Sequence, residues 1–103
     1  MIKLRIDWKR PVAYVSGDEN YTTLHYPDGS TLLVAYTVSW VTTKLNLLRI
    51  HNRISVNRAY VYGWIRHDAR TMAVGVTMST FIKSLEVARR RVAYVEEQLS
   101  KPS

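Results

Sequence analysis

The sequence predicts a mainly β protein of small antiparallel sheets, with a short helix at about 38–46 and a longer C-terminal helix at about 79–99. Apolar and polar residues alternate along several short segments, which is typical of strands with one buried face. Seven Tyr and three Trp add side chains that favour sheets. With 103 residues, 47% of them hydrophobic, the chain can form one domain with a modest core.

The first third of the chain predicts short strands. Proposed strands are Ile2–Ile6, Val12–Val15, Tyr21–Tyr26 and Thr31–Tyr36. The last two flank Pro27-Asp28-Gly29-Ser30, a strong turn signal, and should form a hairpin.

A short helix and a second hairpin are predicted after residue 36. Thr37 can cap a helix that ends near Asn46, since Val38, Val41 and Leu45 share one face. Further along the chain, Ala59–Arg66 and Thr71–Val76 alternate on either side of His67-Asp68-Ala69-Arg70 and predict another hairpin.

Between these elements, the stretch LRIHNRISVN at Leu48–Asn57 alternates with period two, except at Asn52. An amide occupies a position where the buried face should carry an aliphatic side chain, and burying it unpaired would cost about 1–3 kcal/mol. Either Asn52 is hydrogen-bonded inside, or the chain leaves the sheet there and exposes His51-Asn52-Arg53.

In the C-terminal segment the apolar residues recur at heptad spacing, at Phe81, Leu85, Ala88, Val92, Val95 and Leu99. This spacing predicts a helix of about 20 residues. Its apolar stripe would pack either on the protein's own sheet or against a second copy, as a homodimer.

The composition favours a nucleic-acid partner over an enzyme. A net charge of +7 suggests a polyanion, and arginines gather in Leu48–Arg70 and at Arg89-Arg90-Arg91, although two solvated basic faces would look the same. There is no Cys, no metal-ligand spacing among the three His and no nucleotide or nucleophile motif, so we expect no catalysis, cofactor or metal. The start lacks a signal peptide and Leu32–Val41 is too short to cross a membrane, which favours a cytoplasmic protein without membrane contact.

Two stretches together resemble the LytTR family, the DNA-binding domain of many bacterial response regulators. They are AYVSGDENYTTLHYPDGSTLLV at 13–34 and LLRIHNRISVNRAYV at 47–61. The resemblance implies a single LytTR-like domain over 1–103, with the helix at 79–99 as an extension and loops that enter DNA grooves. The family's last strand usually ends V-S-R-R; the matching stretch is taken to be Val74-Gly75-Val76-Thr77, which lacks both arginines.

The resemblance also implies the residues that bind DNA. The first loop would supply Asn20, Tyr21, Thr22 and Thr23, the second His51, Asn52 and Arg53, and a third, ahead of the last helix, Thr77; Arg49 and Arg58 would contact phosphates. Asn52 would pair with an adenine edge, whereas the alternative is an Asn bonded to its own loop.

The expected function is sequence-specific binding of double-stranded DNA by a bacterial transcriptional regulator, with loops in the major groove. The alternative is a LytTR-derived protein-interaction and oligomerisation module with weak or no DNA binding, as the missing arginines suggest. Single-stranded RNA binding on exposed aromatic rings is a third hypothesis, but Trp8, Trp40 and Trp64 are expected to fill the core.

Overall fold

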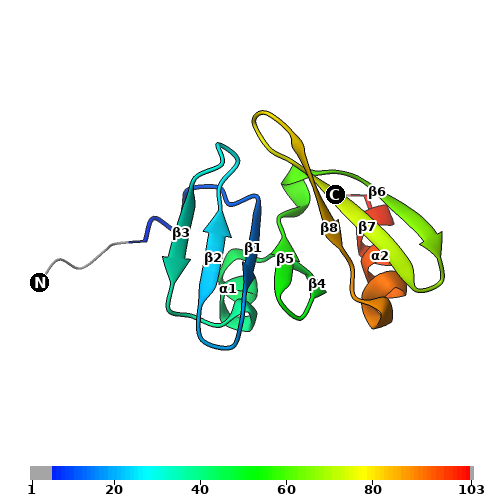
Figure 1. The fold of residues 1–103 in the computed structure, drawn as a ribbon, viewed down its shortest axis with the longest axis horizontal. Helices are drawn as coiled ribbons and strands as arrows, with labels where there is room; N and C mark the ends of the chain where they lie inside the picture. The colour runs from blue at the N-terminus through cyan, green and yellow to red at the C-terminus, as the bar shows by residue number, and fades with distance from the viewer. Residues whose placement is uncertain (1–5, 103) are drawn as a thin grey trace, which may run out of the picture.

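Residues 6–102 of the protein, described in a computed structural model, form two antiparallel sheets that lie side by side (Figure 1). The five-stranded sheet has the order β3-β2-β1-β5-β4 and the three-stranded sheet the order β6-β7-β8. The strands are β1 (Tyr14–Gly17), β2 (Thr22–His25), β3 (Thr31–Val34), β4 (Leu48–His51), β5 (Ile54–Val56), β6 (Val61–Asp68), β7 (Thr71–Thr77) and β8 (Ile82–Glu86). The helical segments are α1 (Val38–Leu45), η1 (Arg58–Tyr60), η2 (Arg89–Arg91) and α2 (Val92–Ser100). Of the proposed strand at 2–6, all but Ile6 lies outside the described residues, and Ile6 is not in a strand.

Local signals of the sequence are confirmed in the first half of the chain. The β2–β3 turn holds Gly29 at a φ of 91°, and the Gly29 N–H donates to the Tyr26 carbonyl at 2.9 Å. The Thr37 side chain accepts from the Trp40 N–H and caps α1, which ends at Asn46. The alternation of LRIHNRISVN is divided between β4 and β5, with the break at Asn52.

The two faces of the five-stranded sheet pack into two separate apolar cores. One face packs on α1 through residues that include Val15, Leu24 and Val41. The other face contributes Ile50 and Val56 to a core shared with the three-stranded sheet and α2. Because β4 and β5 lie at the border between the sheets, their side chains join the two parts of the molecule.

The C-terminal helix is present, but its predicted start near residue 79 is wrong. Ile82–Glu86 is a strand paired with β7, and α2 begins only at Val92. Leu85 is buried and pairs with Val74 of β7. Leu85 and Val87, two residues apart, are both buried, as the period of two in a strand requires. Leu85 also fits the heptad spacing, which is why that spacing predicted a helix here. Neither helix within residues 6–102 is long and apolar enough to cross a membrane.

Two alternatives were open for the apolar stripe of the tail, packing on the protein's own sheets or against a second copy, and the structure shows the first. Val92 and Val95 are 0% exposed in the second core, and Leu99 packs against it. Leu85, Val92 and Val95 of the predicted stripe are therefore buried inside one copy, whereas Phe81 at its start is 52% exposed.

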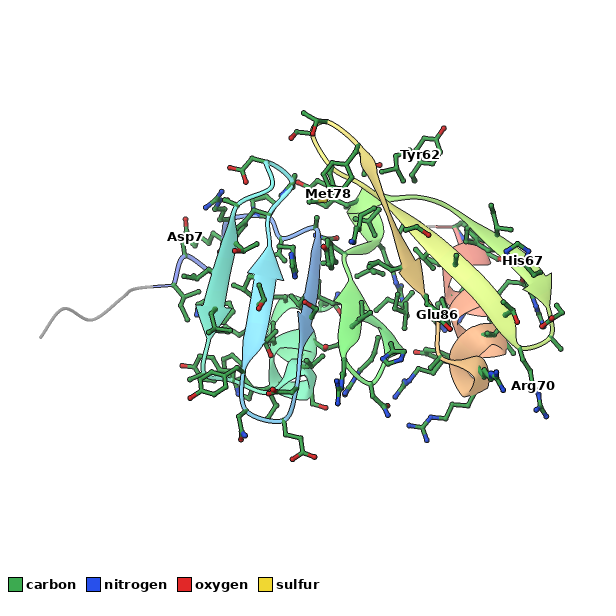
Figure 2. All side chains as sticks on the ribbon, viewed as in Figure 1. Asp7, Tyr62, His67, Arg70, Met78 and Glu86 are labelled. Carbon is green, nitrogen blue, oxygen red and sulfur yellow. The ribbon has the colours of Figure 1, made fainter. Side chains whose placement is uncertain are left out.

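The molecule is elongated, with extents of 51 × 29 × 21 Å, and the strand directions sort its loops to two ends. The β1–β2 loop, the β4–β5 turn and the start of η2 lie at the lower edge in Figure 1. The β7–β8 loop and η1 lie at the upper end. In Figure 2, Met78, which follows β7, lies in the upper part of the view, and Arg70, in the β6–β7 turn, lies at the lower right.

Candidate nucleic-acid interface

Three segments that are distant in sequence form what we call the three-loop edge: the β1–β2 loop (18–21), the β4–β5 turn (52–53) and the segment after β8 (87–91). Backbone hydrogen bonds tie them together. The Gly17 N–H donates to the Arg53 carbonyl at 2.9 Å, and the Ala88 N–H donates to the Ile50 carbonyl at 2.8 Å. A cleft of about 450 Å³ opens between the first two segments, lined by Asp18, Glu19, Asn20, Asn52 and Arg53.

The β1–β2 loop is held in shape by Asp18. Its carboxylate accepts from the N–H groups of Asn20 at 2.8 Å and Tyr21 at 3.0 Å, and these bonds lower the pKa of Asp18. Behind it, Gly17 has no room for a side chain, since a Cβ would lie 2.2 Å from the Tyr21 carbonyl oxygen. The loop thus presents Asn20 and Tyr21 to solvent in a fixed arrangement.

The β4–β5 turn is held by Arg49. Its guanidinium donates to the carbonyls of His51 and Asn52 and to the Ser39 hydroxyl at the start of α1. Burial, and then the charge of Arg91, lower the pKa of Arg49. Arg49 therefore holds the turn and is committed to it, and the Asn52 side chain is exposed rather than buried.

The third segment reaches the turn through Arg90. Its Nη2 donates to Asn52 Oδ1 at 2.9 Å, across 38 residues of sequence. Arg89 and Arg91 flank it, and within residues 6–102 the buried Nε of Arg91 has no hydrogen-bond partner. With Arg53, these side chains make the three-loop edge strongly basic.

Several residues assigned from sequence lie outside this edge. Thr22 is 0% exposed and its hydroxyl donates to the Tyr36 carbonyl at 2.7 Å, so it cannot face a groove in this conformation. Thr23 is half-buried beside Ser16, which it pairs with in the register. Arg58 donates to Gln98 at 2.9 Å at the upper end of the molecule (Figure 1).

The third-loop assignment of Thr77 is corrected by the strand order. Thr77 closes β7 opposite Ile82 at the upper end, and all of β8 separates it from α2 (Figure 1). The last strand is β8, and the chain that follows reads Val87-Ala88-Arg89-Arg90. This matches V-S-R-R at three of four positions, so the two arginines are present. The match lies within the stretch where the heptad spacing predicts a helix, and that spacing obscures it.

The aromatic side chains expected in the core are in part exposed. Trp40 is 43% and Trp64 is 37% exposed. The Trp40 ring, however, stacks on Tyr36 with centroids 4.2 Å apart and meets Trp8 at 5.6 Å. Because Trp8, Tyr36 and Trp40 pack on one another, less of their ring surface is available for stacking bases.

Comparison with known proteins identifies the family and the fold. The family model of the LytTr DNA-binding domain matches residues 5–100. Among solved structures, a chain described as the LytTr DNA-binding domain of a methyl-accepting/DNA response regulator from Bacillus cereus has a TM-score of 0.74 at 14% identity, over 95% of this chain and 88% of that one. At this identity the likeness concerns the fold. No curated protein sequence matches the chain significantly.

Proposed function

Because the chain belongs to the LytTr DNA-binding domain family, we propose that it is a transcriptional regulator whose three-loop edge reads duplex DNA in the major groove. In this proposal side chains of the β1–β2 loop and the β4–β5 turn meet base edges. The arginines around them bind phosphates.

The observation that carries the proposal is the hydrogen bond from Arg90 to Asn52. It orients the amide, so that Nδ2 is available to donate and one Oδ1 lone pair is available to accept. Asn pairs with adenine through this donor and acceptor, at N7 and N6. A base-reading amide that is oriented before DNA arrives loses less conformational entropy on binding.

Affinity would come mainly from charge. Arg53, Arg89 and Arg90 are exposed at the three-loop edge, and cations that neutralise phosphates release counterions. Binding should therefore weaken steeply with salt. Arg49, which contacts carbonyls of its own turn, is assigned a positioning role instead of the phosphate contact expected from sequence.

The alternative of an interaction module rested on two absent arginines, and Arg89 and Arg90 remove that argument. Dimerisation through α2 also loses its basis, since Val92 and Val95 are buried in the protein's own core.

A duplex-binding titration across a salt series, on sequences selected from a random pool, tests the proposal. Asn52→Ala should weaken the selected sequence by about 1–3 kcal/mol and leave random duplex nearly unchanged. Matched controls are Arg58→Ala and Thr77→Ala at the upper end, which should keep the wild-type preference for the selected sequence over random duplex. Equal losses in the controls and in Asn52→Ala, or no duplex binding at low salt, would contradict the proposal.

A further inference from the structure

A carboxylate stands in the middle of the basic edge. Glu19 lines the cleft beside Asn52 and Arg53, and it is exposed. Unlike Asp18, whose carboxylate accepts from two backbone N–H groups, Glu19 has no hydrogen bond or ion pair within residues 6–102. The loop therefore does not need its charge for structure.

DNA offers a carboxylate very few partners. Phosphates carry negative charge and no donor, so they repel it. In the major groove the hydrogen-bond donors are the exocyclic amines, N4 of cytosine and N6 of adenine. A carboxylate at such an interface thus either repels all duplexes alike or accepts from one of these amines.

Arg53, across the cleft from Glu19, favours the cytosine amine over the adenine amine as the partner of this carboxylate. Its backbone N–H donates to His51 Nδ1 at 3.2 Å and its carbonyl accepts from Gly17, but its guanidinium makes no hydrogen bond within residues 6–102. Arginine prefers O6 and N7 of guanine, and in a C·G pair these acceptors lie next to the cytosine amine. One base pair can therefore satisfy the acceptor of Glu19 and the donors of Arg53.

We propose that this cleft is a subsite for a C·G base pair, with Glu19 accepting from cytosine N4 and Arg53 donating to guanine O6 and N7. This inference rests on the proposed function. Glu19 is then a specificity-determining residue: it lowers affinity for most sequences through repulsion of phosphates and restores it only where cytosine stands in reach.

The test compares the base preference of variants in duplex selection, followed by titration of the selected site with one pair exchanged at a time. The wild type should prefer C·G at one position by about 5- to 150-fold, the range that one good base contact gives. Glu19→Ala should reduce that preference to the part that Arg53 supplies through guanine. Glu19→Gln, which adds a donor beside an acceptor, should shift it towards adenine.

The matched control is Glu97→Ala, which makes the same charge change on α2 at an exposed side chain away from the cleft. It should raise affinity slightly for all duplexes without altering any preference. Melting curves should show all variants folded, because Glu19 lies exposed in a loop held by Asp18.

The subsite is overturned if Glu19→Ala strengthens binding to all duplexes equally and leaves every base preference intact, a result that keeps the proposed DNA binding. If the wild type binds no duplex at low salt, both the proposed function and the subsite fail.

Discussion

The three-loop edge and the outer face of the three-stranded sheet are both exposed, yet they are built in opposite ways. At the edge, polar side chains such as Asp18, Arg49 and Asn52 hold one another and the backbone. On the outer face, Ile65 and Ile82 are 63% and 48% exposed, around a groove of about 350 Å³ that Gly63 and Gly75 also line. Tyr62 extends outward beside it (Figure 2).

The difference shows where the molecule is organised for recognition of a polyanion. Local hydrogen bonds from Asp18 and Arg49 shape the individual loops, and bonds such as that from Arg90 to Asn52 join segments that are far apart in the chain. The exposed groups of the edge are therefore held in position, and its arginines give it positive charge. The outer face has open space and little charge. Changes to the groups that hold the backbone of the edge should therefore alter stability and DNA binding together, whereas changes on the outer face should alter neither strongly.

The largest effect should come from a pair of glycine substitutions, one in each region. In Gly17→Ala the new Cβ meets the Tyr21 carbonyl and Thr22 Cα at 2.2 and 2.8 Å, so the backbone must move; we expect a loss of about 3 kcal/mol in the free energy of unfolding. Gly63→Ala meets nothing within 4 Å and should be neutral or stabilise by about 0.5–1 kcal/mol. Urea denaturation of both variants measures the change in the free energy of unfolding. Equal losses in the two variants would contradict the difference that we draw between the edge and the outer face.

The next largest effect should come from Arg49 and should be a loss of DNA binding at the three-loop edge. Arg49→Ala frees the β4–β5 turn and should weaken DNA binding by about 2 kcal/mol. Arg49→Lys should not restore DNA binding. The planar guanidinium of Arg49 donates to Ser39 and to two carbonyls at once, and the compact ammonium of lysine cannot do so. Arg66→Ala, which breaks the 2.7 Å ion pair between Arg66 in β6 and Glu96 in α2, is the control and should bind normally. Full rescue by Lys would instead indicate a phosphate contact.

A smaller effect should appear as coupling between Asn52 and Arg90. If Arg90 orients the amide, the double variant Asn52→Ala/Arg90→Ala should lose less affinity for the selected duplex than the two single losses added. We expect a coupling of about 1 kcal/mol from titrations of all four proteins. Additive losses would mean that the 2.9 Å hydrogen bond does not contribute to recognition.

The smallest effect should be on the pH dependence of stability, through His25 in β2 of the five-stranded sheet. Its Nε2 lies 2.7 Å from Ser16 Oγ and its ring stacks on Tyr14. Burial, and then the charge of Lys83 in β8, lower the pKa of His25 in the folded state. The unfolded chain therefore binds more protons, so this stability is present above pH about 6.5 and is lost as pH falls below it.

Denaturation at pH 7.5 and 5.5 checks this expectation. The loss at pH 5.5 should shrink in His25→Gln and persist in His67→Gln, whose exposed histidine lies in β6. An unchanged pH dependence in His25→Gln would show that protonation of His25 does not oppose folding.

Much of the fold could be predicted because its signals are local. The Thr37 cap, the turn at Gly29 and the break at Asn52 each depend on a few neighbouring residues, and each is found where the sequence indicated. The candidate site was predicted in part for the same reason: the motifs around Asn20 and Asn52 are short and contiguous. Whether these residues contact DNA remains a prediction.

For the aliphatic residues of the tail, the sequence by itself determined which side chains avoid water, and only the tertiary structure decided which kind of element carries each of them. Leu85 and Val92 were correctly expected inside, but one lies in a strand and the other in a helix, because burial has the same apolar signature in both. Arg58 lies six residues from Asn52 and is carried to the far end by β5, while Arg90, 38 residues away, returns along β8 to hydrogen-bond it. Strand direction and sheet order set these distances, and they depend on pairings between distant segments that no local pattern contains.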